Sequence, residues 1–133
     1  MNIEKVEKDE LLYRAIKRSQ PDAIDKKSNK VSSALFKDEL GVSVDRDGKR
    51  AENIVVDSQK SYFAKRYRGT VRVTAEICLA NNMAVIPEPR DENIFHASIY
   101  QDSNKNALSQ LNALKLADAA EIVYYVTETG LEI

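Results

Sequence analysis

Residues 41–48 read GVSVDRDG, and this stretch decides the fold. Val42 and Val44 alternate with Ser43 and Asp45, which is the two-residue period of a strand with one apolar and one polar face. A glycine precedes the strand, and an Asp-Gly pair follows it as a turn signal. The segment therefore predicts a short, half-buried strand whose polar side chains lie opposite its valines.

The segments before this strand predict a second strand, a loop and a capped turn. Residues 11–16, LLYRAI, are a compact apolar run broken by an arginine, and they indicate a strand. Residues 17–30 are polar and contain a proline, so we expect a long exposed loop. In the following VSSALFKDEL segment, Ser32 is a candidate helix N-cap.

Helices and strands alternate irregularly after residue 50. A helix is expected over residues 51–68, with Gly69 in the left-handed position that follows a last turn. Residues 74–82 are either a helix capped by Thr74 or the extension of a strand into a hairpin, and we favour the helix. The remaining expected elements are strands over 70–73, 83–86, 93–100 and 121–126 and a helix over 102–120.

These elements predict a single α+β domain over residues 1–133, a small mixed sheet packed against two to four helices. Residues 1–9 and 127–133 are expected to be loose ends. The apolar share of 43% and the charged share of 31% exclude disordered and low-complexity classes. Because no apolar run approaches the ~18 residues of a membrane helix and the first ten residues are charged, we expect a cytoplasmic protein.

Known sequence motifs mainly exclude functions. The sequence has no GxGxxG, no phosphate loop, no GxSxG elbow and no HExxH. The stretch from Ser43 resembles the start of a calcium-binding loop, but Ile54 stands where the bidentate glutamate must be. With one Cys and one His, no zinc site of the usual kind can form. We therefore expect neither a metal nor a cofactor.

Polar residues at the strand ends are the candidates for a ligand site. Arg14 interrupts an apolar strand, so it needs either a carboxylate such as Asp38 or Asp45 or an anionic ligand. His96 is the only histidine and is either a structural strand residue or a member of a polar cleft. The serines either cap turns or bind a ligand, and none has the context of an activated nucleophile. The candidate ligand-binding residues are Arg14, Ser32, Ser33, Ser43, Asp45, Arg46 and His96.

Several of these segments together resemble an uncharacterised family of small prokaryotic proteins. The shared pieces are LYRAI, SSALFKD, SVDR and a late Pro-x-x-x-Asn-x-x-His stretch, which here runs from Pro89 to His96. The resemblance covers residues 11–100 and is carried by short segments. No activity is known for that family, so the resemblance implies the division into elements and no catalytic role.

Charge is divided unequally along the chain. Residues 1–69 hold sixteen Lys and Arg against twelve Asp and Glu, and residues 70–133 hold four against nine. The basic residues are interleaved with acids, so we expect no membrane binding and treat nucleic acid only as an alternative partner of the basic half. We expect a non-catalytic cytoplasmic module that binds another protein, in a bacterial defence or accessory operon. The alternative is a small enzyme or binder of a phosphorylated or nucleotide-like ligand that uses a polar cleft.

Overall fold

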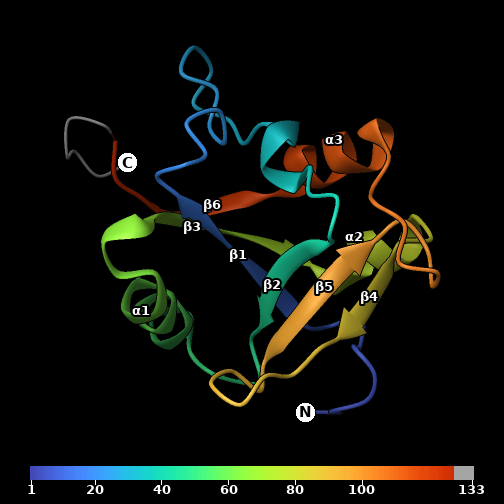
Figure 1. The fold of residues 1–133 in the computed structure, drawn as a ribbon. Coiled ribbons are helices and arrows are strands. Elements are labelled where there is room, and N and C mark those ends of the chain that lie inside the picture. The colour runs from blue at the N-terminus through green and yellow to red at the C-terminus, as the bar shows by residue number, and fades with distance from the viewer. Residues whose placement is uncertain (128–133) are drawn as a thin grey trace.

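A computed structural model describes residues 1–127, in which one sheet has helices on both sides (Figure 1). Within those residues the sheet has six strands in the order β4-β5-β2-β1-β3-β6, and every neighbouring pair is antiparallel. The strands are β1 (Leu11–Lys17), β2 (Val42–Arg46), β3 (Tyr67–Thr74), β4 (Ala84–Pro87), β5 (His96–Tyr100) and β6 (Glu121–Tyr125). The helices are α1 (Glu52–Phe63), α2 (Ala75–Ala80) and α3 (Gln110–Ala119), with short 3₁₀ helices η1 (Ser33–Phe36) and η2 (Ala64–Arg66).

The predicted α+β class is confirmed, and the sheet is antiparallel at every pairing instead of mixed in direction. Most of the expected loose end at 127–133 lies outside the described residues. No helix among residues 1–127 combines the length and the apolarity that crossing a bilayer demands.

One face of the sheet forms the apolar core. Leu12 and Ile16 of β1, Val42 and Val44 of β2 and Val71 of β3 are at most 2% exposed. They pack in one cluster with buried side chains of η1, α2 and α3, and Figure 1 shows η1 and α3 together on one side of the sheet. Each such side chain contributes roughly 1.5–3 kcal/mol through burial. This face therefore supplies most of the stability of the fold.

The opposite face is covered in part by α1. The helix packs on β1 and β3, where Gln59 donates to the Tyr13 carbonyl and accepts from the Thr70 hydroxyl. In Figure 1, α1 lies on the other side of the sheet from η1 and α3. Because strand residues alternate between faces, Ser43 and Asp45 of β2 project on the α1 side. This face is polar, and over β2 and β5 it is hollowed.

Local capping explains where the short helices begin. Thr74 accepts a hydrogen bond from the backbone N–H of Ile77 at 3.4 Å and starts α2, so the favoured helix over 74–82 is confirmed. Ser32 likewise accepts from the N–H of Ala34 at 3.2 Å and caps η1. Both caps are Ser or Thr at the last extended residue, which is the position that favours them.

The predicted helix over 51–68 is too long. The α-helix ends at Phe63, and Ala64 has a φ of 51°, which interrupts the helical path. Gly69 is a strand residue and not a helix terminus: a Cβ there would lie 2.6 Å from the Tyr124 carbonyl oxygen of the neighbouring strand. The glycine is needed for the close approach of β3 and β6.

The predicted helix over 102–120 begins too early. Asp102 accepts from the N–H groups of Asn104 and Asn106 in a turn, and Ser109 is the cap that accepts from Asn112. The polar residues at 102–104 therefore close a loop, and α3 starts at Gln110.

The first nine residues differ from the expected loose end. Val6 is 3% exposed and belongs to the apolar core, and the Arg46 guanidinium donates to the carbonyls of Asn2 and Lys5. The loop over 17–30 is also not wholly exposed, because Ala23 and Ile24 are buried. These segments complete the apolar face at its edges.

Candidate functional site

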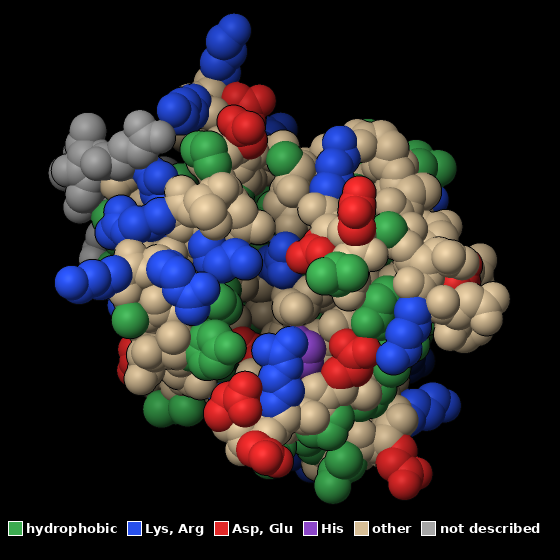
Figure 2. Space-filling view, viewed as in Figure 1, with side chains coloured by type: hydrophobic (Ala, Val, Ile, Leu, Met, Phe, Trp, Pro, Cys, Tyr) green, Lys and Arg blue, Asp and Glu red, His purple; other side chains and the backbone are tan. Residues whose placement is uncertain are grey.

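A pocket of about 550 Å³ opens on the polar face, between α1, strands β1, β2 and β5, and the loop over residues 88–95. Figure 2 shows a hollow near the centre of this side of the molecule, with the purple histidine inside it and Lys and Arg side chains around it. Pockets that hold small molecules have volumes of about 300–1,000 Å³. This one is large enough for a ligand the size of a sugar phosphate or a nucleotide.

Arg14 lies where β1 and β2 separate. The two strands pair only at Leu12–Arg46 and Tyr13–Asp45, and beyond that point the Arg14 side chain reaches across to β2. Its Nε and Nη2 donate to the Leu35 carbonyl at 3.2 and 3.1 Å, and Nη1 donates to the Ser43 carbonyl at 3.0 Å.

The charge of Arg14 has no carboxylate partner among residues 1–127 within ion-pair distance. The side chain is 5% exposed, and this burial lowers the pKa of Arg14, while the nearby Asp38 carboxylate raises it in part. A guanidinium has five N–H donors, and the three hydrogen bonds to carbonyls leave two of them. Arg14 therefore pairs with neither Asp38 nor Asp45, and it lines the pocket.

Asp45 joins α1 and the 88–95 loop to the sheet. Its Oδ2 accepts from the Gln59 amide at 2.8 Å, and its Oδ1 accepts from the Asn93 amide. Burial raises the pKa of Tyr67 to about 12, so its hydroxyl keeps its proton. Because Thr70 donates its own proton to Gln59, Tyr67 is the donor to Thr70. This chain of donors ends on Asp45, so Asp45 holds the pocket walls in position.

His96 lies at the start of β5, directly opposite Asp45. The side chain is 6% exposed and lines the pocket. Its Nδ1 lies 2.9 Å from the Glu88 carbonyl oxygen. Its Nε2 is buried and has no hydrogen-bond partner among the described residues.

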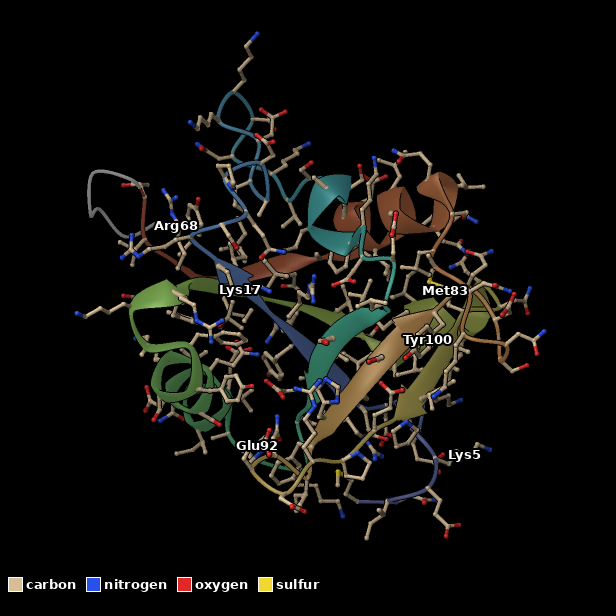
Figure 3. The ribbon with its side chains drawn as sticks, in the orientation of Figure 1. Lys5, Lys17, Arg68, Met83, Glu92 and Tyr100 are labelled. Carbon is tan, nitrogen blue, oxygen red and sulfur yellow. The ribbon has the colours of Figure 1, made fainter. Side chains whose placement is uncertain are left out.

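Three further cations line the pocket and have no carboxylate partner within residues 1–127: Lys17, Arg66 and Arg90. The Arg66 guanidinium lies 5.4 Å from the centre of the Phe63 ring. Figure 3 shows Lys17 near the end of β1 and Glu92 at the opposite end of the pocket, in the loop before β5. Lys17 and Arg66 therefore lie where β1 and α1 end, and Arg90 lies in the 88–95 loop with Glu92.

One wall of the pocket is aromatic. Tyr62 and Phe63 at the end of α1 contact each other edge to face, with ring centres 4.8 Å apart, and both line the pocket together with Tyr13. Tyr62 is 49% exposed. An exposed ring beside a cationic site offers a surface on which a planar group can stack.

The structure separates the seven predicted ligand residues into two groups. Arg14, Ser43, Asp45 and His96 line one pocket. The other three lie outside it: Ser32 caps η1, Ser33 accepts from Gln110 at 3.4 Å, and Arg46 pairs with Glu10 at 2.7 Å.

Arg46 lies outside the pocket because of strand alternation. It follows Val44 by two residues, so its side chain projects on the apolar face with the valines and away from Ser43 and Asp45. There the Glu10 carboxylate and two backbone carbonyls surround it. The strand period predicts this position for Arg46. The same period places Arg14 on the face of Leu12 and Ile16, and Arg14 lines the pocket at the gap where β1 and β2 separate.

Several pocket residues were not predicted. Lys17 shares the face of Tyr13 by simple alternation, and that signal was available. Arg66 lies in the mixed aromatic and basic segment SYFAKRYRG, and Arg90 and Asn93 lie in the stretch from Pro89 to His96. Their place in one pocket depends on how α1 and the 88–95 loop fold over the sheet, which the sequence pattern does not specify.

Comparisons with known proteins found no match: no family model, no curated protein and no solved structure is significantly similar to this chain. Within residues 1–127, no three His, Cys, Asp or Glu side chains gather closely enough to hold a metal ion. A functional inference therefore depends on the residues of the pocket.

Proposed function

We propose that the pocket binds a small anionic ligand of the phosphorylated or nucleotide-like class. The observation that carries this proposal is the set of pocket cations without carboxylate partners, Lys17, Arg66 and Arg90, beside the buried Arg14. Burying a guanidinium costs free energy unless hydrogen bonds and opposite charge offset that cost. Backbone carbonyls supply the hydrogen bonds of Arg14, and an anion in the pocket supplies the opposite charge.

No carboxylate of the pocket among residues 1–127 forms an ion pair with these cations. Asp45 is bonded to two amides, and neither Asp38 nor Glu92 forms an ion pair with a residue from 1 to 127. Arg binds phosphate through a planar set of N–H donors, and Lys binds it as a point charge. The aromatic wall at Tyr62 and Phe63 suits a ligand that carries a planar group next to its phosphate.

Calorimetric titration with inorganic phosphate and with adenosine monophosphate tests this proposal. We expect Arg66→Gln and Lys17→Gln each to weaken binding about three- to tenfold, which corresponds to roughly 0.7–1.4 kcal/mol. Lys65→Gln is the matched control, because Lys65 is exposed, adjacent to Arg66 and outside the pocket lining. Equal affinities in all three variants and the wild type would count against the pocket as the binding site.

A second candidate, binding to another protein, is supported by a surface on α2 and α3. Leu111 is 61% exposed and Leu114 is 45% exposed, one turn apart on α3, while Leu79 of the contacting helix α2 is 41% exposed. Adjacent exposed leucines are a common feature of protein-binding surfaces. If this surface binds a protein, Leu111→Glu with Leu114→Glu will abolish co-purification of that protein, and Arg66→Gln will leave it intact.

A further inference from the structure

We propose that His96 makes the pocket selective for an anionic group that carries a proton, so that the protein takes phosphate in preference to sulfate. This inference rests on the proposed function, since it concerns the ligand of the same pocket. It specifies that the ligand must donate a hydrogen bond to one buried nitrogen, His96 Nε2.

The tautomer of His96 follows from its partner. Nδ1 lies 2.9 Å from the Glu88 carbonyl oxygen, and a carbonyl oxygen only accepts hydrogen bonds. Nδ1 therefore carries the proton. In the neutral imidazole Nε2 then has a lone pair and no hydrogen, so it acts as an acceptor.

This acceptor is unfilled. His96 Nε2 is buried and has no partner within residues 1–127, and the side chain lines the pocket, so a ligand contacts Nε2 once the imidazole turns toward the pocket. Buried polar atoms in native proteins are almost always hydrogen-bonded, and leaving one unbonded costs about 1–3 kcal/mol. A donor from the ligand relieves this cost.

The neighbouring side chains do not supply that donor. The Asp45 carboxylate opposite His96 only accepts, and it already receives hydrogen bonds from Gln59 and Asn93. The amide of Asn93 donates to Asp45 and its oxygen accepts from the Phe95 N–H. None of these groups donates a hydrogen bond to His96 Nε2.

Arg14 and His96 both line the pocket. The Arg14 Nη1 donates to the backbone carbonyl of Ser43, which is diagonal to His96 across the β2–β5 pair. The buried cation and the unfilled acceptor therefore belong to one pocket.

Phosphate and sulfate differ in whether they carry a proton that they can donate to His96 Nε2. Both are tetrahedral oxyanions of similar size, but near neutral pH inorganic phosphate keeps at least one P–OH group and sulfate has none. A phosphate monoester carries that proton only in its monoanionic form, so it presents the donor below its second pKa of about 6 and not as the dianion above it. Sulfate would instead place an acceptor oxygen against the Nε2 lone pair, which repels it.

The experiment is a pair of calorimetric titrations with sodium phosphate and sodium sulfate at matched ionic strength and about pH 8. We expect the wild type to bind phosphate about tenfold more tightly than sulfate. His96→Asn keeps an amide donor near Nδ1 and removes the acceptor at Nε2, so the preference falls to near unity through weaker phosphate binding. His96→Gln places an amide near the Nε2 position and restores part of the preference.

The outcomes separate this inference from the proposed function. Equal affinity of the wild type for the two anions, or an unchanged ratio in His96→Asn, overturns the role of His96. If Arg66→Gln still weakens both anions in that case, the anion site itself stands. If neither anion binds, or the Lys17 and Arg66 variants bind as the wild type does, both proposals fail. A wild-type ratio near unity overturns the role of His96 even where one His96 variant does not fold, and a ratio near ten is assigned to His96 by whichever of the two variants folds.

Discussion

The two faces of the sheet are formed by the same strands but bury different groups. On one face Leu12 and Val44 pack into an apolar cluster. On the other, Asp45 and Thr70 are joined through Gln59 in a chain of hydrogen bonds, and His96 keeps an unfilled acceptor. The period-2 alternation of the strands places most apolar side chains on one face and most hydrogen-bonding side chains on the other, and the buried Arg14 and Arg46 are exceptions on the apolar side.

The largest stability effect is expected on the apolar face. Leu116 of α3 is fully buried, and Leu116→Ala leaves a cavity in the cluster. We expect a loss of about 2–5 kcal/mol in the free energy of unfolding, measured by urea denaturation. Phosphate affinity should stay within twofold of the wild type in the folded variant, and a larger loss of binding would show that the two faces are coupled.

A smaller loss is expected where charge is buried on the apolar face. Glu10→Gln removes the carboxylate that pairs with Arg46 at 2.7 Å and leaves a guanidinium that is 1% exposed. We expect destabilisation of about 2–3 kcal/mol at neutral pH. This variant tests whether the two faces act independently, because we expect it to lower stability without altering anion binding.

The same pair predicts a pH dependence. Burial by itself raises the pKa of Glu10, but the hydrogen bonds from Arg46 and from the Glu7 backbone outweigh it and hold the net pKa below the ordinary 4.5. A lowered pKa in the folded state means that the stabilisation is complete above about pH 4.5 and is lost as the pH falls through the native value. Urea titrations across acid pH should show the wild type and Glu10→Gln converging; a constant difference would contradict this assignment.

On the polar face, Gln59 connects the network of hydrogen bonds. Gln59→Ala removes the acceptor of the Thr70 hydroxyl and the amide donor to one Asp45 oxygen, so we expect a loss of about 1–3 kcal/mol. Unlike Leu116→Ala, this change should also weaken phosphate binding, because Asp45 holds the 88–95 loop. A stability loss with unchanged affinity would mean that the network does not position the pocket.

The smallest stability effect is expected at the pocket cations. Arg66 is exposed and unpaired within the described residues, so Arg66→Gln should change the free energy of unfolding by no more than about 0.5 kcal/mol. Its effect should appear in anion affinity alone. Thermal unfolding with and without phosphate measures both quantities, and a destabilised Arg66→Gln would indicate a structural role instead.

The fold could be predicted from the sequence where a local rule was decisive. Alternation in residues 42–45 identified β2, and the Thr74 cap identified α2. The predicted start of α3 was wrong because Asp102 and Ser109 are both good caps, and only packing selects between them. Gly69 was misread because its reason is the contact with Tyr124 on another strand.

The candidate site was accessible from the sequence only in part. Arg14 and His96 stood out because each is a polar residue within an apolar strand. The contribution of Arg66 and Arg90 depends on the placement of α1 and the 88–95 loop over β2 and β5, which is set by tertiary packing. No pattern along the chain brings those residues together.

The central claim is that the polar face is the ligand-binding face, and an NMR titration with inorganic phosphate tests it most directly. We expect saturable shifts of the backbone amides around Ser43, Asp45, Gln59 and His96, with none at Leu111 or Leu114 of α3. Shifts that centre on α3, or no saturable shifts at any residue, would contradict the account.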